Sequence, residues 1–161
     1  MVKMELKEAK RQAQDLLKRT WVVYVATIGE NGFPQVRAVE NLKGTERFPH
    51  LAKLFEREEF EFATLLSTIT GFNKLKEIQA NPSGSIYYCL EKEWKGLRME
   101  GRFEIVNDKD IKRQIWNDDW KALFPEGSLD PRQTVVRFTP RKVVYYDGTS
   151  GHVTLEPHKN S

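Results

Sequence analysis

The alternation of apolar and polar residues along the chain predicts mainly β-strands, with a few helices. Residues 5–18 repeat apolar side chains every three or four positions, a pattern typical of an amphipathic helix. Residues 21–28 (WVVYVATI) are β-branched and aromatic on both faces, so we expect a central strand covered on both sides. Turn residues around 29–34 then predict a hairpin whose second strand spans 35–42.

The second half of the chain continues in the same manner. Strands are expected at 60–68, 85–90, 97–106, 133–139 and 142–147, with Pro140 separating the last two. A helix starts near Gly71 and stops at Asn81-Pro82. Asn107 and Asp108 favour the start of a third helix, whose apolar residues are Ile111, Ile115, Trp116, Trp120 and Phe124.

These elements indicate a mainly β fold. Six or seven strands at hairpin spacing, with three helices, are typical of an antiparallel barrel or highly curved sheet with helices outside. A doubly wound fold is excluded, because strands and helices do not alternate and no glycine-rich loop follows the first strand. No repeat or linker divides the 161 residues, so we expect one domain over 1–161, with a mobile tail over 148–161.

The composition limits the kinds of ligand or partner that we expect this domain to bind. Its 26 basic and 23 acidic residues are interspersed, whereas duplex-binding proteins cluster their basic residues; the net charge of +3 suits a small anionic ligand better than nucleic acid. The longest apolar run, 21–26, is too short to span a membrane. The charged stretch 1–19 is unlike a signal peptide, and a lone Cys89 excludes an internal disulfide, so a cytoplasmic location is expected.

Known catalytic and metal-binding motifs are missing from the sequence. There is no G-x-S-x-G elbow, H-E-x-x-H or Walker motif. The three histidines His50, His152 and His158 lack metal-ligand spacing, so no metal site is expected. If the protein is an enzyme, a bound cofactor must supply its chemistry.

The most informative stretch is the junction between a strand and a helix at 67–74 (STITGFNK). A helix start exposes unpaired backbone N–H groups and a partial positive charge. Four polar side chains surround it, those of Ser67, Thr68, Thr70 and Asn73. If Thr70 caps the helix, Lys74 lies near the end of the first turn, where the helix dipole disfavours a cation by roughly 0.3–1 kcal/mol. A phosphate bound at the helix start would make the position of Lys74 favourable instead of unfavourable. The alternative interpretation is that Thr70 only caps the helix and Lys74 points into water.

Two further features bear on this junction. Arg37 lies in the middle of a strand, and its guanidinium suits bidentate contact with phosphate if it converges with Lys74 on one anion. Otherwise it is an exposed strand residue or the member of a rim ion pair. Trp116 and Trp120 are four residues apart, and we interpret them as core or interface packing rather than as a lid over a cofactor.

The chain resembles the pyridoxamine 5'-phosphate oxidase-like FMN-binding split-barrel family, and within it most closely the general stress protein branch. The resemblance rests on five blocks in the same order: ATIGENGFPQVRAVEN at 26–41, STITGFNKLKEIQANPSGSIYY at 67–88, KGLRMEGRFEIVND at 95–108, WNDDWKALFPEGSLDP at 116–131 and VVRFTPRKVVYYDG at 135–148. It implies a six-stranded antiparallel split barrel with Greek-key connections and flanking helices. It also implies a homodimer with FMN bound at the subunit interface.

The resemblance also implies roles for individual residues. Arg37 and Lys74 match the arginine and lysine that meet the FMN phosphate. Ala38 and Val39 match the strand beside the isoalloxazine ring, and Ser67 and Thr68 match the pair that ends the next strand. Asn73 stands where many members have arginine, and Phe72 replaces a serine, so the contact with phosphate is weaker. The arginine and histidine segment with which true pyridoxamine phosphate oxidases bind substrate has no counterpart, so vitamin B6 oxidation is not expected.

The resulting hypothesis is a dimeric FMN-binding oxidoreductase. It would take a hydride from NADH or NADPH and pass electrons to a quinone, a nitro compound or oxygen. The alternative is a non-catalytic module that binds flavin or another phosphorylated or planar ligand.

Overall fold

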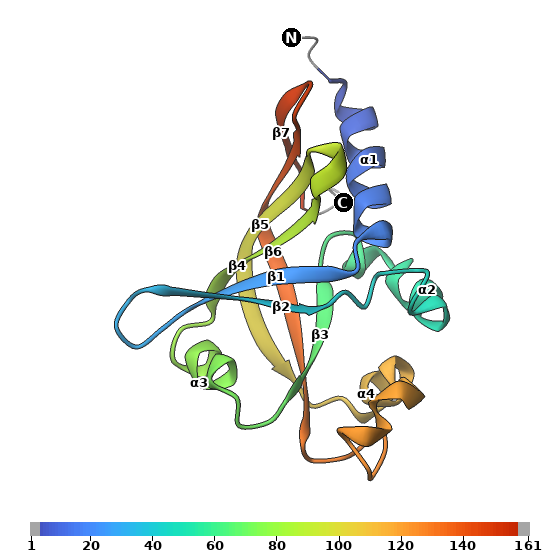
Figure 1. Cartoon of the computed structure of the whole chain (residues 1–161), viewed down its shortest axis with the longest axis vertical. Helices are drawn as coiled ribbons and strands as arrows, with labels where there is room; N and C mark the ends of the chain where they lie inside the picture. The colour runs from blue at the N-terminus through green and yellow to red at the C-terminus, as the bar shows by residue number, and fades with distance from the viewer. Residues whose placement is uncertain (1–3, 158–161) are drawn as a thin grey trace.

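A computed structural model describes residues 4–157 of the chain, which fold around one antiparallel sheet (Figure 1). Its strands are β1 (Val22–Ile28), β2 (Pro34–Glu40), β3 (Thr64–Ile69), β4 (Ser83–Leu90), β5 (Lys95–Val106), β6 (Gln133–Asp147) and β7 (Gly151–Leu155). The α-helices are α1 (Leu6–Arg19), α2 (Ala52–Phe55), α3 (Asn73–Ala80) and α4 (Lys109–Ile115). The mainly β architecture expected from the sequence is confirmed.

The sheet curls into a barrel that is split between two strands. Its main order is β2-β1-β4-β5-β6-β3, and β7 pairs with the other end of β6, so β2 forms one edge and β3 and β7 share the opposite edge. β2 and β3 contact each other without forming a ladder. β3 lies beside β6, while β4, β5 and β6 are consecutive antiparallel neighbours, which is a Greek-key arrangement. The expected split barrel is therefore present.

The last strand differs from expectation, because β6 runs unbroken through Pro140. Gly101 of β5 pairs with Pro140 and Glu100 pairs with Lys142, so Arg141 is an extra residue at a bulge. Proline is tolerated there since a bulge removes the need for a ladder N–H at that point. The expected mobile tail is also wrong for the described residues: β7 pairs with β6, and Leu155 is buried. Residues 158–161 of that tail, including His158, lie outside the described range.

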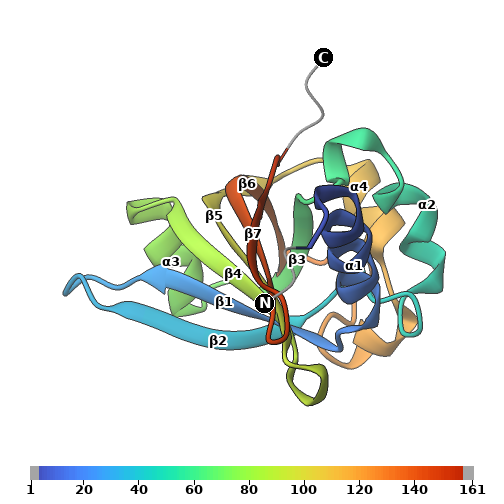
Figure 2. The same cartoon turned by 90° about the horizontal axis from the view of Figure 1, so that it is seen from above.

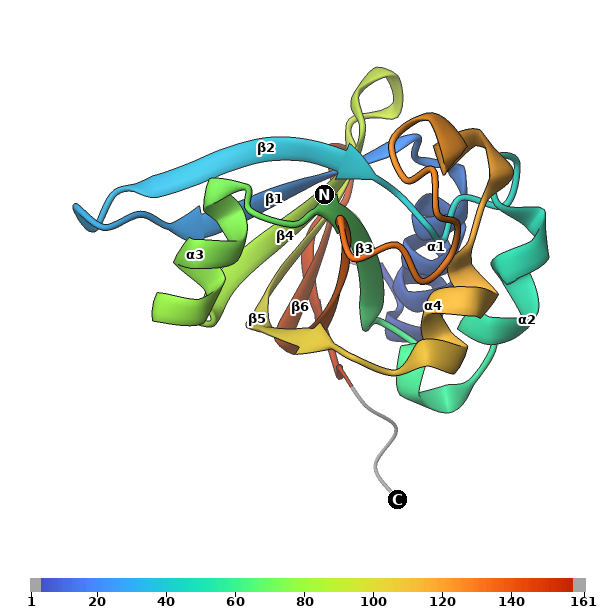
Figure 3. The ribbon, with the colours of Figure 1, turned by 90° about the horizontal axis from the view of Figure 1, so that it is seen from below.

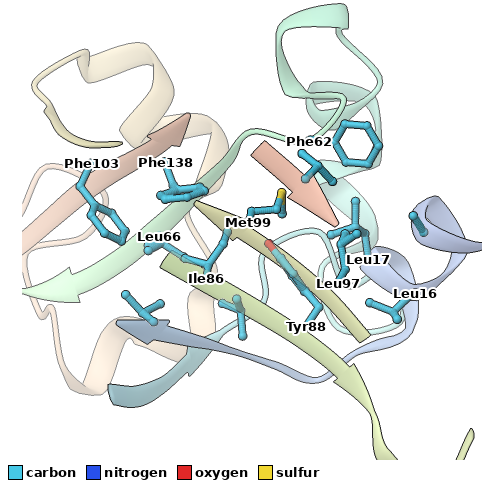
Figure 4. Close-up of a cluster of buried hydrophobic side chains, with 14 of the residues drawn as sticks. Leu16, Leu17, Phe62, Leu66, Ile86, Tyr88, Leu97, Met99, Phe103 and Phe138 are labelled. Atoms are coloured by element: carbon cyan, nitrogen blue, oxygen red, sulfur yellow. The ribbon is translucent and has the colours of Figure 1, made fainter. Parts of the chain in front are cut away.

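Two apolar cores flank the sheet. The first fills the barrel and joins α1 to the inner faces of the strands, with Leu16, Tyr88, Leu97, Met99 and Phe138 among its members (Figure 4). The second lies between the β3–β6 edge and the segments around α2 and α4. Figure 2 shows α1, α2 and α4 on one side of the molecule, whereas α3 stands apart beside the β1–β2 hairpin.

β1 is not covered on both sides, contrary to expectation. Val23, Val25 and Thr27 point into the barrel and are buried, but Tyr24 on the other face is exposed. Since β2 and β4 flank β1, the same outer face presents Val36 of β2 and Tyr87 of β4, both exposed. The hydrophobic pattern of β1 therefore reflects one buried face and one exposed apolar face.

Candidate functional site

The start of α3 presents backbone N–H groups that no side chain caps. Gly71 has a φ of 91°, a left-handed conformation that turns the chain from β3 into the helix. The N-cap residue is Phe72, whose side chain makes no capping hydrogen bond. Thr70 is therefore not the cap; its hydroxyl bonds instead to the carbonyl of Pro131 and the hydroxyl of Thr134. This helix start has the N–H groups and the dipole that favour an anion.

A cleft of about 530 Å³ lies at this helix start, where β2 passes beside the turn after β3. Its lining residues are Arg37, Ala38, Gly71, Phe72, Asn73 and Lys74. Figure 3 shows α3 below the β1–β2 hairpin, close to the end of β3. Four of the seven expected site residues thus meet in one cleft: Arg37, Ala38, Asn73 and Lys74.

Arg37 is held in place by three hydrogen bonds that its guanidinium donates. Its Nη1 donates to Thr27 Oγ1 at 2.6 Å and to the carbonyl oxygen of Gln35 at 3.0 Å. Its Nη2 donates to Glu77 Oε2 at 3.1 Å. The hydroxyl of Thr27 also donates to Glu77 Oε2, so Thr27, Arg37 and Glu77 form a closed cluster.

Lys74 adds a second cation to the same cleft. Burial lowers its pKa from the ordinary lysine value, and the positive charge of Arg37 lowers that pKa further. Its Nζ lies 5.5 Å from the centre of the Phe72 ring, and no ion-pair partner for it is found among residues 4–157. An anion between Arg37 and Lys74 would relieve their repulsion. The cleft therefore fits a phosphate group, through two cations and the uncapped helix start.

Three other expected site residues do not line this cleft. Val39 is half-buried against the barrel core. Ser67 accepts a hydrogen bond from Gln133 Nε2 at 2.8 Å, and Thr68 is buried with no partner for its hydroxyl within the described chain. Their proposed contacts with a ring-shaped ligand remain predictions.

Sequence reasoning missed Thr27 and Glu77, which complete the arginine cluster. Glu77 lies three residues after Lys74, and hydrogen bonds from Thr27 and Arg37 lower the pKa of its carboxyl. The spacing from Lys74 could have placed Glu77 near the helix start, but only the packing of α3 against β1 brings it to Thr27.

The two tryptophans pack in the second core, as the sequence predicts. Trp120 is buried, lies edge-to-face with Trp116, and donates from Nε1 to Glu40 Oε2 at 2.9 Å. They do not share one helix, however: α4 ends at Ile115 and a short 3-10 turn over Asp118–Ala122 follows. Asp108 caps α4 as expected, by accepting from the backbone N–H groups of Asp110 and Ile111.

The described residues hold no cluster suited to a metal ion. Within 4–157, no three His, Cys, Asp or Glu side chains are grouped for coordination. His50 contacts the carbonyl of Trp116, and His152 lies against the Tyr146 ring. No helix in this range is long and apolar enough to cross a bilayer.

Comparison with known families identifies the class of this fold. Residues 55–157 match the family described as "Pyridoxamine 5'-phosphate oxidase like", which is more than half of the chain. The chain belongs to this family, as its sequence blocks indicate, and members of the family commonly bind a flavin. A comparison with curated protein sequences finds no significant match.

Solved structures with the same fold include two connected with general stress protein 26. The protein from Clostridium acetobutylicum, described as related to general stress protein 26 of B. subtilis, has a TM-score of 0.74 at 24% identity, over 95% of this chain and 96% of that chain. General Stress Protein 26 from Bacillus anthracis str. Sterne has a TM-score of 0.66 at 17% identity, over 94% and 100%. A heme binding protein from Mycobacterium smegmatis has a TM-score of 0.66 at 14% identity, over 98% and 60%. At these identities the likeness establishes the fold alone.

Proposed function

We propose that this protein binds FMN in the cleft between β2 and α3. The observation that supports it best is the convergence of Arg37 and Lys74 at an uncapped helix start. Two cations and free backbone N–H groups at one point are suited to a phosphate, and charge-assisted hydrogen bonds are the strong ones. Arg37 and Lys74 would bind the phosphate, Asn73 would contribute its amide, and Ala38 and Val39 would lie along the ring. Ser67 and Thr68 would flank the ring at the end of β3.

The active form in this proposal is a homodimer. Tyr24, Val36 and Tyr87 form an exposed apolar area on the outer face of β1, β2 and β4, and Ala38 continues it to the cleft. A second copy of the chain on this face would cover the apolar side chains and close one wall of the cleft. FMN would then lie at the subunit interface.

The expected activity is electron transfer from NADH or NADPH to a small acceptor. Bound FMN supplies hydride chemistry, while the chain's own residues bind the phosphate, orient the ring and exclude water. Arg37 and Lys74 would hold the phosphate end of the ligand, and Ala38 would lie along its ring. The second candidate is a binding module without turnover, which needs the same contacts and differs only in whether a nicotinamide can reach the ring.

A titration with FMN tests the binding proposal directly. Purification without added flavin can yield colourless protein, so FMN is added to the purified chain and its fluorescence is followed. We expect quenching with a dissociation constant in the micromolar range or below. No quenching at tens of micromolar protein would contradict the proposal.

A further inference from the structure

Glu77 does not line this cleft itself, but its carboxylate contacts Arg37, which does. Its carboxylate accepts from Arg37 Nη2 at 3.1 Å and from the hydroxyl of Thr27, and its side chain is only 13% exposed. The same hydrogen bonds keep its pKa below the ordinary value, so the carboxylate is ionised at neutral pH. A permanent negative charge therefore lies beside the cation that would bind phosphate.

The partners of Arg37 show that Glu77 leaves part of the guanidinium free. An arginine side chain has five N–H donors. Both donors on Nη1 are satisfied by Thr27 and Gln35, and Glu77 takes one donor on Nη2. The Nε donor and the second Nη2 donor have no partner among residues 4–157. These two can point in parallel at two oxygens of one anion, so Glu77 fixes Arg37 without occupying its bidentate edge.

The charges of the cleft follow from this arrangement. Arg37 and Lys74 contribute two positive charges, and the negative charge of Glu77, in an ion pair with Arg37, offsets one of them. A phosphate monoester is mostly dianionic at neutral pH, because its second pKa is about 6. The cleft therefore attracts the phosphate dianion much more weakly than it would if Glu77 did not oppose the two cations. A ligand with a neutral hydroxyl in place of the phosphate is little affected by the charge of Glu77.

We propose that Glu77 limits the preference of this cleft for phosphorylated over unphosphorylated ligands. The inference rests on the proposed flavin site. The ligands it concerns are flavins with and without the terminal phosphate. The difference in affinity between these two ligands should be smaller than Arg37 and Lys74 alone would impose. Glu77 acts through Arg37 and through the field at the cleft, and is a specificity-determining residue of the site.

The test compares the wild-type chain with Glu77→Gln, using FMN and riboflavin as ligands. Glutamine keeps a carbonyl oxygen that can accept from Thr27 and Arg37, but it removes the charge. We expect FMN to bind about tenfold more tightly to the variant, because a short-range repulsion is removed. Riboflavin affinity should change by less than about twofold, since it has no phosphate to repel. Glu91→Gln, at an exposed position in the β4–β5 connection, changes net charge equally and is the matched control.

Ionic strength separates an electrostatic gain from a rearranged cleft. The advantage of Glu77→Gln for FMN should shrink as salt is added, because mobile ions screen the charge that was removed. A gain that is independent of salt, or equal for FMN and riboflavin, would overturn the inference. FMN binding to Glu77→Gln that is equal to or weaker than wild type would also overturn it.

A second probe keeps this inference distinct from the flavin proposal. Inorganic phosphate is added to both proteins, and the rise in their thermal unfolding temperature is measured. If neither protein binds FMN but phosphate stabilises Glu77→Gln more than wild type, the flavin proposal fails and the role of Glu77 stands. If phosphate stabilises both proteins equally and FMN binds both equally, the role of Glu77 fails and the flavin proposal stands.

Discussion

Tyr24 of β1 and Tyr87 of β4 lie directly opposite each other in the sheet, and both rings are on its outer face. Tyr24 is 42% exposed and Tyr87 38%, and Val36 on the neighbouring strand is 67% exposed. Apolar side chains that gather on one face of a sheet mark a surface that another molecule covers. In the proposed assembly that molecule is a second copy of the chain.

Tyr24→Arg should therefore convert the protein from dimer to monomer. The wild-type chain is expected to scatter light as twice its 18.8 kDa at micromolar concentration, and the variant as a single chain. Burying an unpaired charge in an apolar interface is costly, and two-fold symmetry would place two such charges there. Leu6→Arg, on an exposed position of α1, is the control and should remain dimeric. A monomeric wild type that still binds FMN would contradict the assembly.

Arg37→Ala and Lys74→Ala should each weaken FMN binding by about tenfold to a hundredfold, since a charge-assisted hydrogen bond contributes roughly 1.5–3 kcal/mol. Riboflavin, which lacks the phosphate, should lose much less. Titration of both flavins against each variant measures the difference. Lys76→Ala, an exposed lysine on the same helix outside the lining of this cleft, should bind both flavins as wild type does. Equal losses for FMN and riboflavin would show that Arg37 and Lys74 act through folding.

Lys43 predicts a pH dependence of stability away from the cleft. Its Nζ donates to the carbonyls of Phe60 at 2.5 Å and Glu61 at 3.3 Å, and burial lowers its pKa to about 7, although the charge of Glu61 opposes the shift. Between pH 7 and the ordinary lysine range, the unfolded chain binds this proton and the folded chain does not. The free energy of unfolding should therefore rise with pH across that interval.

Denaturant unfolding at several pH values checks this expectation. Lys43→Met should show a flatter rise between pH 7 and about 10, because it removes the group that the folded chain deprotonates. Lys53→Met, at an exposed position of α2, should keep the wild-type slope. An unchanged slope in Lys43→Met would mean that Lys43 stays charged in the folded protein.

Gly101→Ala should destabilise the barrel at its bulge. A Cβ on Gly101 would overlap the carbonyl oxygen of Thr139 and lie 2.8 Å from Phe138 Cζ and 2.9 Å from Pro140 Cα. Two of these neighbours are backbone atoms, which cannot rotate away, so the cost should be about 3 kcal/mol or more. A lower urea midpoint at unchanged m-value measures it. A loss below about 1 kcal/mol would show that the bulge shifts to admit the methyl group.

Much of the fold could be predicted from local patterns. The alternation in β5 and the turn residues after β1 depend on neighbours in sequence, and the structure places strands there. The continuity of β6 through Pro140 could not be predicted, because it depends on a bulge formed against Gly101 of another strand. β7 was missed for a similar reason: its residues form a strand only because β6 offers a free edge beyond β3.

The candidate site was also predictable only in part, because some of its contacts depend on residues that lie far apart in the sequence. Arg37 and Lys74 bear the charges that a phosphate needs, so residue type together with their places in a strand and at a helix start selected them, and the structure brings them into one cleft. Glu77 and Thr27 carry no such signal, since their role arises from α3 packing on β1. Thr70 looked like a cap by residue type, but Pro131 and Thr134 across the β3–β6 edge take its hydrogen bonds.

Reduction by a nicotinamide decides between an oxidoreductase and a binding module. Hydride transfer needs only an open face of the flavin, with donor and acceptor atoms roughly 3–3.5 Å apart. Trp116 and Trp120 could have blocked that face, but the indole of Trp120 is anchored to Glu40 and both rings pack in the second core. We therefore expect NADH or NADPH, mixed anaerobically with the FMN-loaded protein, to bleach the flavin absorbance faster than it bleaches free FMN. Dithionite is the control, because it reduces flavin without needing a binding site. If dithionite bleaches the bound flavin and neither nicotinamide does so faster than in free solution, the protein is a binding module.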